Sequence, residues 1–415
     1  MGRADPIMPE PAPAARWLSI VGIGEDGVEG LSHIASGLIA SADIVFGGER
    51  HLELAASLIR GEAKQWPSPF SDAVGAVLAA RGRQVCVLAS GDPFHYGVGS
   101  VLADRVAPEE TLVVPAPSSF SLAAARLGWA LPDIALVSLH GRALDRIRPQ
   151  LHPGARVLAL TSDRDGPEAL ARLLAESGFG ASRLTVLEAL GGPRERIRST
   201  RAAQFNLNGI GALNIVAVAV EAAPGARIIA YAPGLADDLF EHDGQITKSE
   251  IRAVTLSALA PLRGALLWDI GAGSGSVAIE WLLAHTSMRA IAIEAQANRA
   301  ARIRRNAAAF GVTELEVVES RAPEALVPLA TPDAVFVGGG ASDERVLDAV
   351  TAALRAGGRL VVNAVTLETE AALIARHESC GGTLSRIAIA RAGSVGDKTA
   401  WRAAMPVTQW VWVKP

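Results

Sequence analysis

The chain has 415 residues, half of them hydrophobic and a fifth charged, with a formal net charge of −4. This length suits two or three domains, and the acidic excess argues against a protein that coats nucleic acid. Cys86 and Cys380 lie far apart without the spacing of metal ligands, so the sequence predicts neither a disulfide framework nor a metal site and favours a reducing cytoplasm.

The N-terminal segment and the apolar runs predict no membrane partner. Residues 1–15 are rich in Pro and Ala and lack the apolar core of a signal peptide, so we expect a disordered tail. The most apolar run, residues 213–220, is far shorter than the roughly 20 residues of a membrane span. The expected protein is cytoplasmic.

Four apolar runs in the first half alternate with helical stretches such as 71–81 and 120–127. They predict strands at 17–21, 42–46, 84–88 and 111–114, the third of which contains Cys86 as a buried thiol. Each strand runs into a loop rich in Gly, Ser or Pro, at 22–27, 47–51, 89–97 and 115–119. This alternation predicts a parallel α/β domain whose ligands bind at the carboxyl ends of the strands.

Three of these loops together carry a family resemblance. Gly-x-Gly at 22–24, Ser-Gly-Asp-Pro-x-x-Tyr-Gly at 90–97 and Pro-Ser-Ser at 117–119 resemble the tetrapyrrole methylases, the class III fold of S-adenosylmethionine-dependent enzymes, over about 17–221. Many members carry Pro where this chain has Glu25. The resemblance implies two subdomains that hold the folded cofactor between them. The implied cofactor contacts are Gly22, Gly24, Ser90, Gly91, Asp92, Pro93, Ser118 and Ser119.

The second subdomain is predicted to contain strands at 134–139, 156–160, 184–187 and 214–220. Segments 115–129 and 138–142 resemble the branch of the family that methylates the corrin precursor at carbon 5. Its substrate carries several carboxylates, which arginine binds well. The candidate substrate contacts are His95, Tyr96, Arg126, His140 and Arg142. Simple alternatives stay open, namely a plain turn at Asp92-Pro93 and structural roles for the others.

Pro224, Gly225, Pro233 and Gly234 interrupt both periodicities, so residues 223–240 are predicted to link a domain at 16–222 to one at 241–415. Thr247 and Glu250 then have capping-box spacing ahead of a helix that is apolar on one side.

Residues 266–280 form the centre of the second half. Apolar residues lead into Asp269, and Gly271, Gly273 and Gly275 precede a helix, which predicts a strand, a tight turn and a helix N-terminus facing a ligand. Ser276 stands where a dinucleotide fingerprint has its third glycine. The next strand, 290–293, ends on Glu294, which is suitably placed to bind ribose hydroxyls.

This run resembles motif I of the class I S-adenosylmethionine-dependent methyltransferases. The small corrin methyltransferases that this half resembles also carry Thr-Lys at the position of Thr247. Ser320-Arg321 replaces the Gly-Asp of related enzymes, so the side-chain contact of that Asp cannot be expected here. A backbone contact by the next residue, Ala322, can be. The implied cofactor contacts are Thr247, Gly271, Ala272, Gly273, Ser274, Gly275, Glu294 and Ala322.

Further strands are predicted at 315–318, 332–337, 359–362, 383–390 and 407–413. The last two lack a clear helix between them, which matches a Rossmann-like, seven-stranded class I sheet with a reversed last strand. Gly338, Gly339, Gly340 and Asn363 follow central strands and leave room for a large flat substrate, although the glycines are also compatible with a plain tight connection. The arginine-rich helix 298–310 is predicted to present a solvated face.

The order of the two halves, class III before class I, resembles the precorrin-6Y C(5,15)-methyltransferase (decarboxylating) family of cobalamin biosynthesis. This resemblance implies conversion of precorrin-6Y (precorrin-6B) to precorrin-8X, with carbon 5 methylated by the first half and carbon 15 methylated by the second, which also decarboxylates the ring C acetate. It implies two S-adenosylmethionine sites per chain, and we expect a homo-oligomer. No Ser-His-Asp or Cys-His arrangement is present, as expected for an enzyme that works by alignment, so no catalytic residue is assigned.

Other functions stay open at this point. One is a different methyltransferase pair, acting on another tetrapyrrole or on RNA, although the acidic balance disfavours RNA. A nicotinamide dehydrogenase is disfavoured by Ser276 and by the three loops of the first half. A non-enzymatic S-adenosylmethionine sensor or scaffold would tolerate decay of one site, and both glycine motifs are intact.

Overall fold

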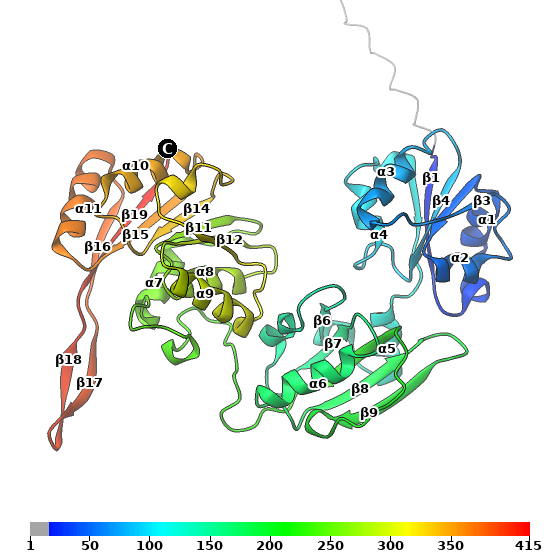
Figure 1. Cartoon of the computed structure of the whole chain (residues 1–415), viewed down its shortest axis with the longest axis horizontal. Helices are drawn as coiled ribbons and strands as arrows, with labels where there is room; N and C mark the ends of the chain where they lie inside the picture. The colour runs from blue at the N-terminus through cyan, green and yellow to red at the C-terminus, as the bar shows by residue number, and fades with distance from the viewer. Residues whose placement is uncertain (1–15) are drawn as a thin grey trace, which may run out of the picture. The chain divides into compact units, whose positions relative to one another are not determined.

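The computed structural model describes residues 16–415, and the tail predicted at 1–15 lies outside the described residues. The chain forms two compact units (Figure 1). The first comprises the described residues up to Arg142 together with Pro153–Ala223, and the second comprises Ala143–His152 with Pro224–Pro415. The sequence prediction placed 143–152 in the first domain and 223–240 in a linker, whereas the structure groups 143–152 and 224–240 with the second unit.

The first sheet of the first unit is parallel, with strand order β3-β2-β4-β1-β5. Its parallel register brings the loops after β1, β4 and β5 to one edge, as predicted. Strand β3 was not predicted, because three of its four residues are polar and it lies at the edge of the sheet. The strands are β1 (Leu18–Ile23), β2 (Ile44–Gly47), β3 (Glu62–Gln65), β4 (Val85–Ser90) and β5 (Thr111–Val114).

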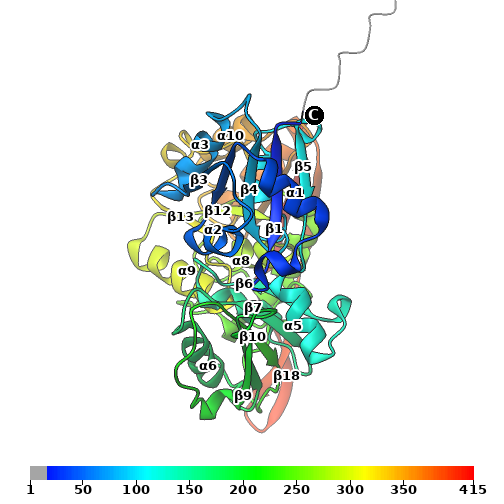
Figure 2. The same ribbon diagram turned by 90° about the vertical axis from the view of Figure 1, so that its right-hand side faces the viewer.

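Helices cover both faces of this sheet because its strands alternate apolar side chains between the faces. Val21, Val45 and Cys86 pack under α1 (His33–Ser41) and α2 (Glu49–Ala55), and α1 faces the viewer in Figure 2. The opposite face packs against α3 (Ala73–Leu78) and α4 (Val98–Ala103). Cys86 is fully buried, as predicted, and burial raises the pKa of its thiol to about 12.

The second sheet has strand order β6-β7-β10-β8-β9 and is mixed, since only the β6–β7 pair is parallel. Helix α5 (Ser119–Leu127) packs on it through Phe120, and α6 (Gly166–Glu176) through Leu170. Strand β9 was not predicted, because the run Arg-Ile-Arg-Ser-Thr-Arg has no apolar face. The strands are β6 (Ala135–Ser138), β7 (Arg156–Leu160), β8 (Arg183–Glu188), β9 (Arg196–Arg201) and β10 (Asn214–Ala219).

The second unit contains the predicted seven-stranded sheet, in the order β13-β12-β11-β14-β15-β19-β16. Strand β19 runs antiparallel to both β15 and β16, which confirms the predicted reversed last strand. The strands are β11 (Leu266–Ile270), β12 (Arg289–Glu294), β13 (Glu316–Glu319), β14 (Ala334–Val337), β15 (Arg359–Ala364), β16 (Thr383–Ile387) and β19 (Val407–Val413).

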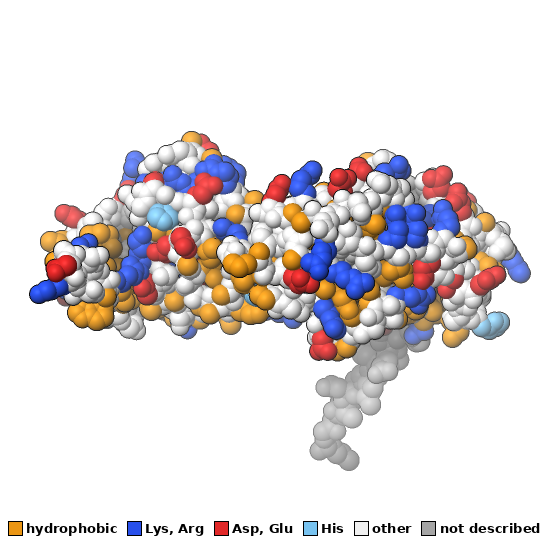
Figure 3. All heavy atoms as spheres, turned by 90° about the horizontal axis from the view of Figure 1, so that it is seen from below, with side chains coloured by type: hydrophobic (Ala, Val, Ile, Leu, Met, Phe, Trp, Pro, Cys, Tyr) orange, Lys and Arg blue, Asp and Glu red, His pale blue; other side chains and the backbone are white. Residues whose placement is uncertain are grey.

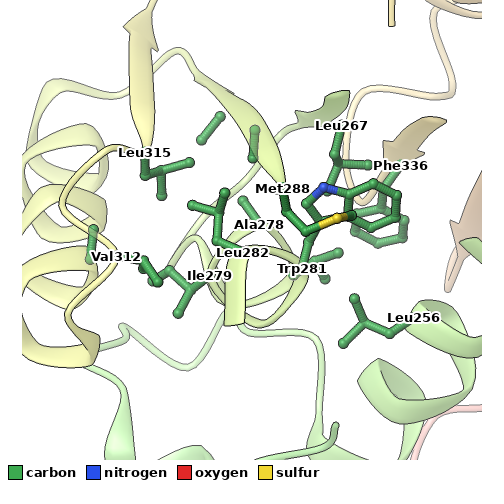
Figure 4. Close-up of a cluster of buried hydrophobic side chains, with 14 of the residues drawn as sticks. Leu256, Leu267, Ala278, Ile279, Trp281, Leu282, Met288, Val312, Leu315 and Phe336 are labelled. Atoms are coloured by element: carbon green, nitrogen blue, oxygen red, sulfur yellow. The ribbon is translucent and has the colours of Figure 1, made fainter. Parts of the chain in front are cut away.

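Large side chains fill both sides of this sheet. On one side α7 (Ser249–Leu259), α8 (Ser276–Leu283) and α9 (Ala297–Phe310) pack around Trp281, which lies beside Met288 and Phe336 in Figure 4. On the other side α10 (Glu344–Ala353) and α11 (Leu367–Cys380) cover Trp268 and Trp410. Short 3₁₀ helices lie at Gly27–Gly30, Phe70–Asp72, Pro108–Glu110, Leu131–Asp133, Leu144–Gln150, Ala202–Gln204, Asp237–Leu239 and Glu324–Leu326.

Two features of the second unit were not predicted. Strands β17 (Ala390–Val395) and β18 (Lys398–Ala403) form a hairpin that projects from the sheet, as Figure 1 shows. The hairpin follows directly after the predicted strand 383–390, and the sequence has no clear turn signal that would separate the two. The 3₁₀ helix Leu144–Gln150 packs on α9, with Ile147 fully buried and Arg146 Nη1 3.0 Å from Glu314 Oε2.

Two candidate cofactor sites

The first unit has a cavity of about 490 Å³ between its two sheets. The first sheet contributes the loops that follow β1, β4 and β5, and the second contributes the ends of β6, β7 and β10. The structure therefore brings several predicted residues to one site, as a two-subdomain cofactor site requires. Those that line it are Gly24, Ser90, Gly91, Ser118, Ser119, His95, Tyr96 and His140.

Gly22, Asp92 and Pro93 shape the loops without lining the cavity. A Cβ on Gly22 would lie 2.6 Å from the amide nitrogen of Ala116, so only glycine lets these loops meet. Asp92 Oδ1 accepts a hydrogen bond from the Phe94 amide at 2.9 Å, which forms a turn. Cofactor contact by Gly22, Asp92 and Pro93 stays a prediction.

Ser118 begins helix α5 at the cavity wall. Its Oγ accepts a hydrogen bond from the Ser121 amide at 3.2 Å, and the residue is 8% exposed. The helix therefore directs its first amide groups, beginning with that of Ser119, toward the cavity. A helix N-terminus in this position favours an anionic group such as a carboxylate.

The predicted substrate residues of the first unit separate into two groups. His95 stacks on Phe120 with ring centroids 4.7 Å apart, and the guanidinium of Arg142 lies 5.9 Å from the centroid of the Tyr96 ring. Arg142 lies outside the cavity lining, and so does Arg126. The Arg126 guanidinium makes hydrogen bonds of 2.7 and 3.0 Å to Glu195, which lower the pKa of that carboxyl.

A polar cluster of Glu25, Arg50, His51 and Ser90 lines the same cavity. Arg50 pairs with the buried carboxylate of Glu25 and lies 2.9 Å from both His51 Nε2 and Ser90 Oγ. His51 Nε2 lies 2.8 Å from Ser90 Oγ. Burial and the charge of Arg50 lower the pKa of His51 to about 4. In the sequence, residues 47–51 are recognisable only as a strand-end loop, and no local pattern indicates a role for Arg50 or His51.

The second unit has a cavity of about 820 Å³ at the carboxyl ends of β11, β12, β14 and β15. Most of the predicted residues of this half line it, whereas Ser274 and Gly275 do not. The predicted residues that do are Thr247, Gly271, Ala272, Gly273, Glu294, Ala322, Gly338, Gly339, Gly340 and Asn363.

The three glycines of the motif I loop have positive φ angles, of 68°, 59° and 76° at Gly271, Gly273 and Gly275. Their surroundings differ. A Cβ on Gly271 would lie 2.9 Å from the backbone of Gly339, and a Cβ on Gly275 would lie 2.8 Å from Ile303. Near the Cβ position of Gly273 lie only two carbonyl oxygens, at 3.5 and 4.0 Å, which is ordinary contact distance. The backbone at Gly273 is therefore the part of the loop that is open to a ligand.

Glu294 holds this loop from the end of β12. Its Oε2 accepts a hydrogen bond from the Gly273 amide and its Oε1 one from the Gln296 amide, both at 2.9 Å. A carboxylate can accept about four hydrogen bonds, so each oxygen keeps capacity for a ribose hydroxyl. An acid that accepts further hydrogen bonds beside an open glycine backbone fits a nucleoside cofactor.

Asp269 lies below the loop and is 1% exposed. Its Oδ2 accepts a hydrogen bond from the Ala278 amide at 3.0 Å, and its Oδ1 has no hydrogen-bond partner among the described residues. Burial, with a smaller contribution from the nearby Glu294, raises the pKa of this carboxyl to about 7. Asp269 thus fixes the start of α8 rather than lining the cavity.

The wall at Thr247 depends on a buried arginine. Helix α7 begins after Lys248 without a side-chain cap, so the predicted capping box at Thr247 is wrong. Arg252 is fully buried and binds the Thr247 carbonyl, Glu280 at 2.5 Å and Asp237 at 3.2 Å. A buried charge requires such partners. These contacts span 15 and 28 residues of chain, which explains why local patterns did not reveal them.

Further contacts fix other polar groups near the cavity. The Asn363 amide donates to Thr255 Oγ1 and its oxygen accepts from Gln409, both at 2.9 Å. Arg299 and Arg302 pair with Asp243 at 2.9 and 3.1 Å and are only 16% exposed, so the predicted solvated face is wrong for these two side chains. Their pairing lowers the pKa of the Asp243 carboxyl.

The chain resembles known proteins over nearly its whole length. Residues 18–206 match the family described as tetrapyrrole (corrin/porphyrin) methylases, and residues 238–414 match the precorrin methyltransferase domain. A precorrin-6Y C(5,15)-methyltransferase [decarboxylating] of Sinorhizobium sp is 60% identical over 411 residues, covering 99% of this chain and 100% of the relative.

One further relative agrees with this match, and one solved structure is similar to part of the chain. The protein of the same name from Mycobacterium tuberculosis (strain CDC 1551 / Oshkosh) is 40% identical, covering 94% of this chain and 98% of the relative. The crystal structure of the C-terminal domain of precorrin-6Y C5,15-methyltransferase from Rhodobacter capsulatus is 46% identical. It covers 45% of this chain and 100% of that domain, with a TM-score of 0.43.

Proposed function

The chain belongs to the precorrin-6Y C(5,15)-methyltransferase (decarboxylating) family, and from this premise we propose that it converts precorrin-6Y (precorrin-6B) to precorrin-8X in cobalamin biosynthesis. The reaction comprises two S-adenosylmethionine-dependent methylations, at carbons 5 and 15, and decarboxylation of the ring C acetate. The single observation that carries the proposal is the presence of two separate cavities in one chain, each lined by strand-end glycine loops of a different fold.

We propose that each cavity binds one S-adenosylmethionine, so that the chain has two cofactor sites. The class III unit is assigned carbon 5, and the class I unit is assigned carbon 15 and the decarboxylation. Glu294 and the open backbone at Gly273 support the second site. Ser118 and the start of α5 support the first.

The cofactor supplies an activated methyl group on a sulfonium, so the residues of this chain need only bind, orient and exclude water. Orientation of two reactants contributes up to about 7–11 kcal/mol to a reaction of this kind. The glycine loops fix the position of the donor. Lys248, Arg321 and Arg391 line the second cavity and provide cationic partners for the carboxylates of the tetrapyrrole.

We further propose that the enzyme is a homo-oligomer in the cytoplasm. The β17–β18 hairpin supports self-association, because it pairs with no other sheet among the described residues and Trp401 on it is 77% exposed. Light scattering of the full chain tests this, and a monomer at micromolar concentration would contradict it. In the described part of the chain, no helix has the length and apolar character to cross a membrane.

The direct test of the function is turnover. The purified chain, incubated with S-adenosylmethionine and precorrin-6B, should yield a product that has gained two methyl groups and lost carbon dioxide, as mass spectrometry would show. A product with one methyl group, or no reaction with this tetrapyrrole, would contradict the proposal.

RNA is a weaker candidate for the substrate, because Lys and Arg side chains are interspersed with Asp and Glu on the face shown in Figure 3.

A further inference from the structure

The two methylations leave different charges behind, given the proposed function on which this inference rests. At carbon 5, the π electron pair of an enamine forms the new C–CH₃ bond while the S–CH₃ pair stays on sulfur. The ring system is then a cation and must release its N–H proton to become neutral. At carbon 15, the electron pair of the breaking C–CO₂⁻ bond neutralises the cation instead, and carbon dioxide leaves. A proton acceptor is therefore needed at the carbon 5 site and not for the methyl transfer at carbon 15.

The two cavities differ in whether histidine, the usual proton acceptor at neutral pH, lines them. The first is lined by His51, His95 and His140, whereas no His, Tyr or Cys is among the described residues that line the second. All three histidines belong to the described residues. Among them, only His51 has a ring nitrogen that is hydrogen-bonded to other side chains. His95 is instead stacked on Phe120.

The hydrogen bonds of His51 define its tautomer. Arg50 Nη2 lies 2.9 Å from Nε2, and a guanidinium can only donate hydrogen bonds, so Nε2 must carry a lone pair. The ring proton is then on Nδ1, which is buried without a partner among the described residues. Ser90 Oγ accepts from Arg50 at 2.9 Å and lies 2.8 Å from Nε2, so its own proton can pass to the ring.

The charged groups around His51 keep it neutral and ready to accept a proton. Arg50 precedes it on α2, Glu25 from the loop after β1 holds Arg50, and Arg194 from the loop after β8 lies 3.6 Å from Glu25. Burial and Arg50 lower the pKa of His51 to about 4, so the imidazole is uncharged at neutral pH. A polycarboxylate substrate in the cavity would offset the positive charge of Arg50 and make the ring a stronger base.

We propose that His51, acting through the Ser90 hydroxyl, accepts the proton that carbon 5 methylation releases. The substrate N–H proton passes to Ser90 Oγ as the Ser90 proton passes to His51 Nε2. Arg50 Nη2 then no longer donates to Nε2 and keeps its hydrogen bond to Ser90 Oγ and its ion pair with Glu25. The thioether product and the methylated ring are both neutral, and the positive charge remains on the imidazolium until solvent removes the proton. Glu25 and Arg50 are positioning residues that hold the acceptor nitrogen toward Ser90.

The first test is spectroscopic and needs no turnover. Long-range ¹H–¹⁵N spectra of the labelled full chain should show His51 as the Nδ1–H tautomer and neutral down to about pH 5. In Arg50→Gln the pKa of His51 should rise but stay below the ordinary value of about 6.5, because burial is the larger cause of the lowering. An Nε2–H tautomer, or a His51 titration unchanged by Arg50→Gln, would overturn the proposal.

The second test compares the two activities of one chain. His51→Gln should slow carbon 5 methylation about 100-fold, within the usual range for a proton acceptor. Carbon 15 methylation and carbon dioxide release should change less than about twofold, as should all activities of the control His33→Gln, an exposed residue on α1. A carbon 5 rate within about threefold of the parent would overturn the proposal.

A third measurement keeps the inference testable if His51→Gln fails to fold. The acid limb of carbon 5 methylation should lie well below neutral pH in the parent and should shift to higher pH in Arg50→Gln. An identical profile in both proteins would refute the role of His51. If the parent forms no doubly methylated product, the proposed function fails as a whole. If the parent is active and these variants behave like it, only this inference fails.

Discussion

The cavity of the first unit and that of the second are both built where parallel strands end, yet different groups line them. Stacked rings and a neutral histidine line the first, at His95, Tyr96 and His51. Carboxylates and guanidinium groups line both cavities, at Glu25 and Arg50 in the first and at Glu294 and Arg391 in the second, but no His or Tyr is among the described residues that line the second. Since both bind the same cofactor class in our proposal, the difference reflects what happens after methyl transfer, which is loss of a proton in one case and of carbon dioxide in the other.

The units also differ in how their walls are held. In the second unit a fully buried guanidinium, Arg252, ties the segment before α7 to Glu280 on α8. In the first unit the loops meet by close backbone contact at Gly22, and Glu25, which is 7% exposed, pairs with the partly exposed Arg50. The second site should therefore be more sensitive to removal of one charge. Because the two activities reside in different units, each unit serves as the control for the other.

The largest effect is expected from Arg252→Met. Removing the guanidinium leaves Glu280 buried without its cation, which should lower the free energy of unfolding of the second unit by about 3–5 kcal/mol. The thermal unfolding transition of this unit should move down, and carbon 15 activity should fall with it. Arg355→Met, at an exposed ion pair, is the control. If Arg252→Met lost carbon 5 methylation as much as carbon 15 methylation while the first unit stayed folded, the two units would not be independent in the way proposed.

A pH effect of similar size is expected at Asp269. Burial raises its folded pKa from 3.8 to about 7, so its contribution to stability is fully present below about pH 4 and is lost as pH rises through about 7. At about 1.4 kcal/mol per pKa unit, the contribution amounts to about 4 kcal/mol at most. Asp269→Asn removes the titration. From pH 4 to pH 8 the parent should therefore lose stability relative to Asp269→Asn. If the difference in unfolding free energy between the two proteins stays constant over this range, the raised pKa of Asp269 is wrong.

Glu294→Ala is expected to separate the two activities. It removes two hydrogen bonds from the motif I loop and the acceptors for ribose, and a loss of about 3 kcal/mol corresponds to a roughly 100-fold slower carbon 15 methylation. Carbon 5 methylation should stay within about twofold. Glu319→Ala, at the exposed end of the neighbouring strand, is the matched control. Partial products identified by mass spectrometry decide between these outcomes.

The smallest effect is expected from Arg142→Ala in the first unit. Its guanidinium lies over Tyr96 at an exposed position, where such a contact contributes about 0.5–1 kcal/mol. The KM for the tetrapyrrole in carbon 5 methylation should rise several-fold while the affinity for S-adenosylmethionine stays the same. If the KM for the tetrapyrrole and the affinity for S-adenosylmethionine changed equally, Arg142 would not be a substrate contact.

Local sequence patterns predicted the elements that carry cofactor loops. The strands that contain Gly22 and Ser90 near their carboxyl ends, and the strand before Gly271, are apolar and run into glycine-rich turns, so their type and position were readable. The edge strands β3 and β9 were missed because their residues are mostly polar. The hairpin β17–β18 was missed because it buries little apolar surface.

The polar clusters were missed for a different reason. Glu25 meets Arg50 across 25 residues and Ser90 meets Arg50 across 40, and no local periodicity records such pairings. The fully buried Arg252 looked like an ordinary helix arginine, since only its buried partners distinguish it. Sequence patterns thus located the backbone of both sites, whereas the side-chain contacts that define their chemistry required the fold.

The most direct test of two separate cofactor sites is calorimetry of the full chain with S-adenosylhomocysteine, the product form of the cofactor. We expect two binding sites per parent chain, and one in Glu294→Ala with the carbon 5 site intact. A stoichiometry of one in the parent, or loss of all binding in a folded Glu294→Ala protein, would contradict the account.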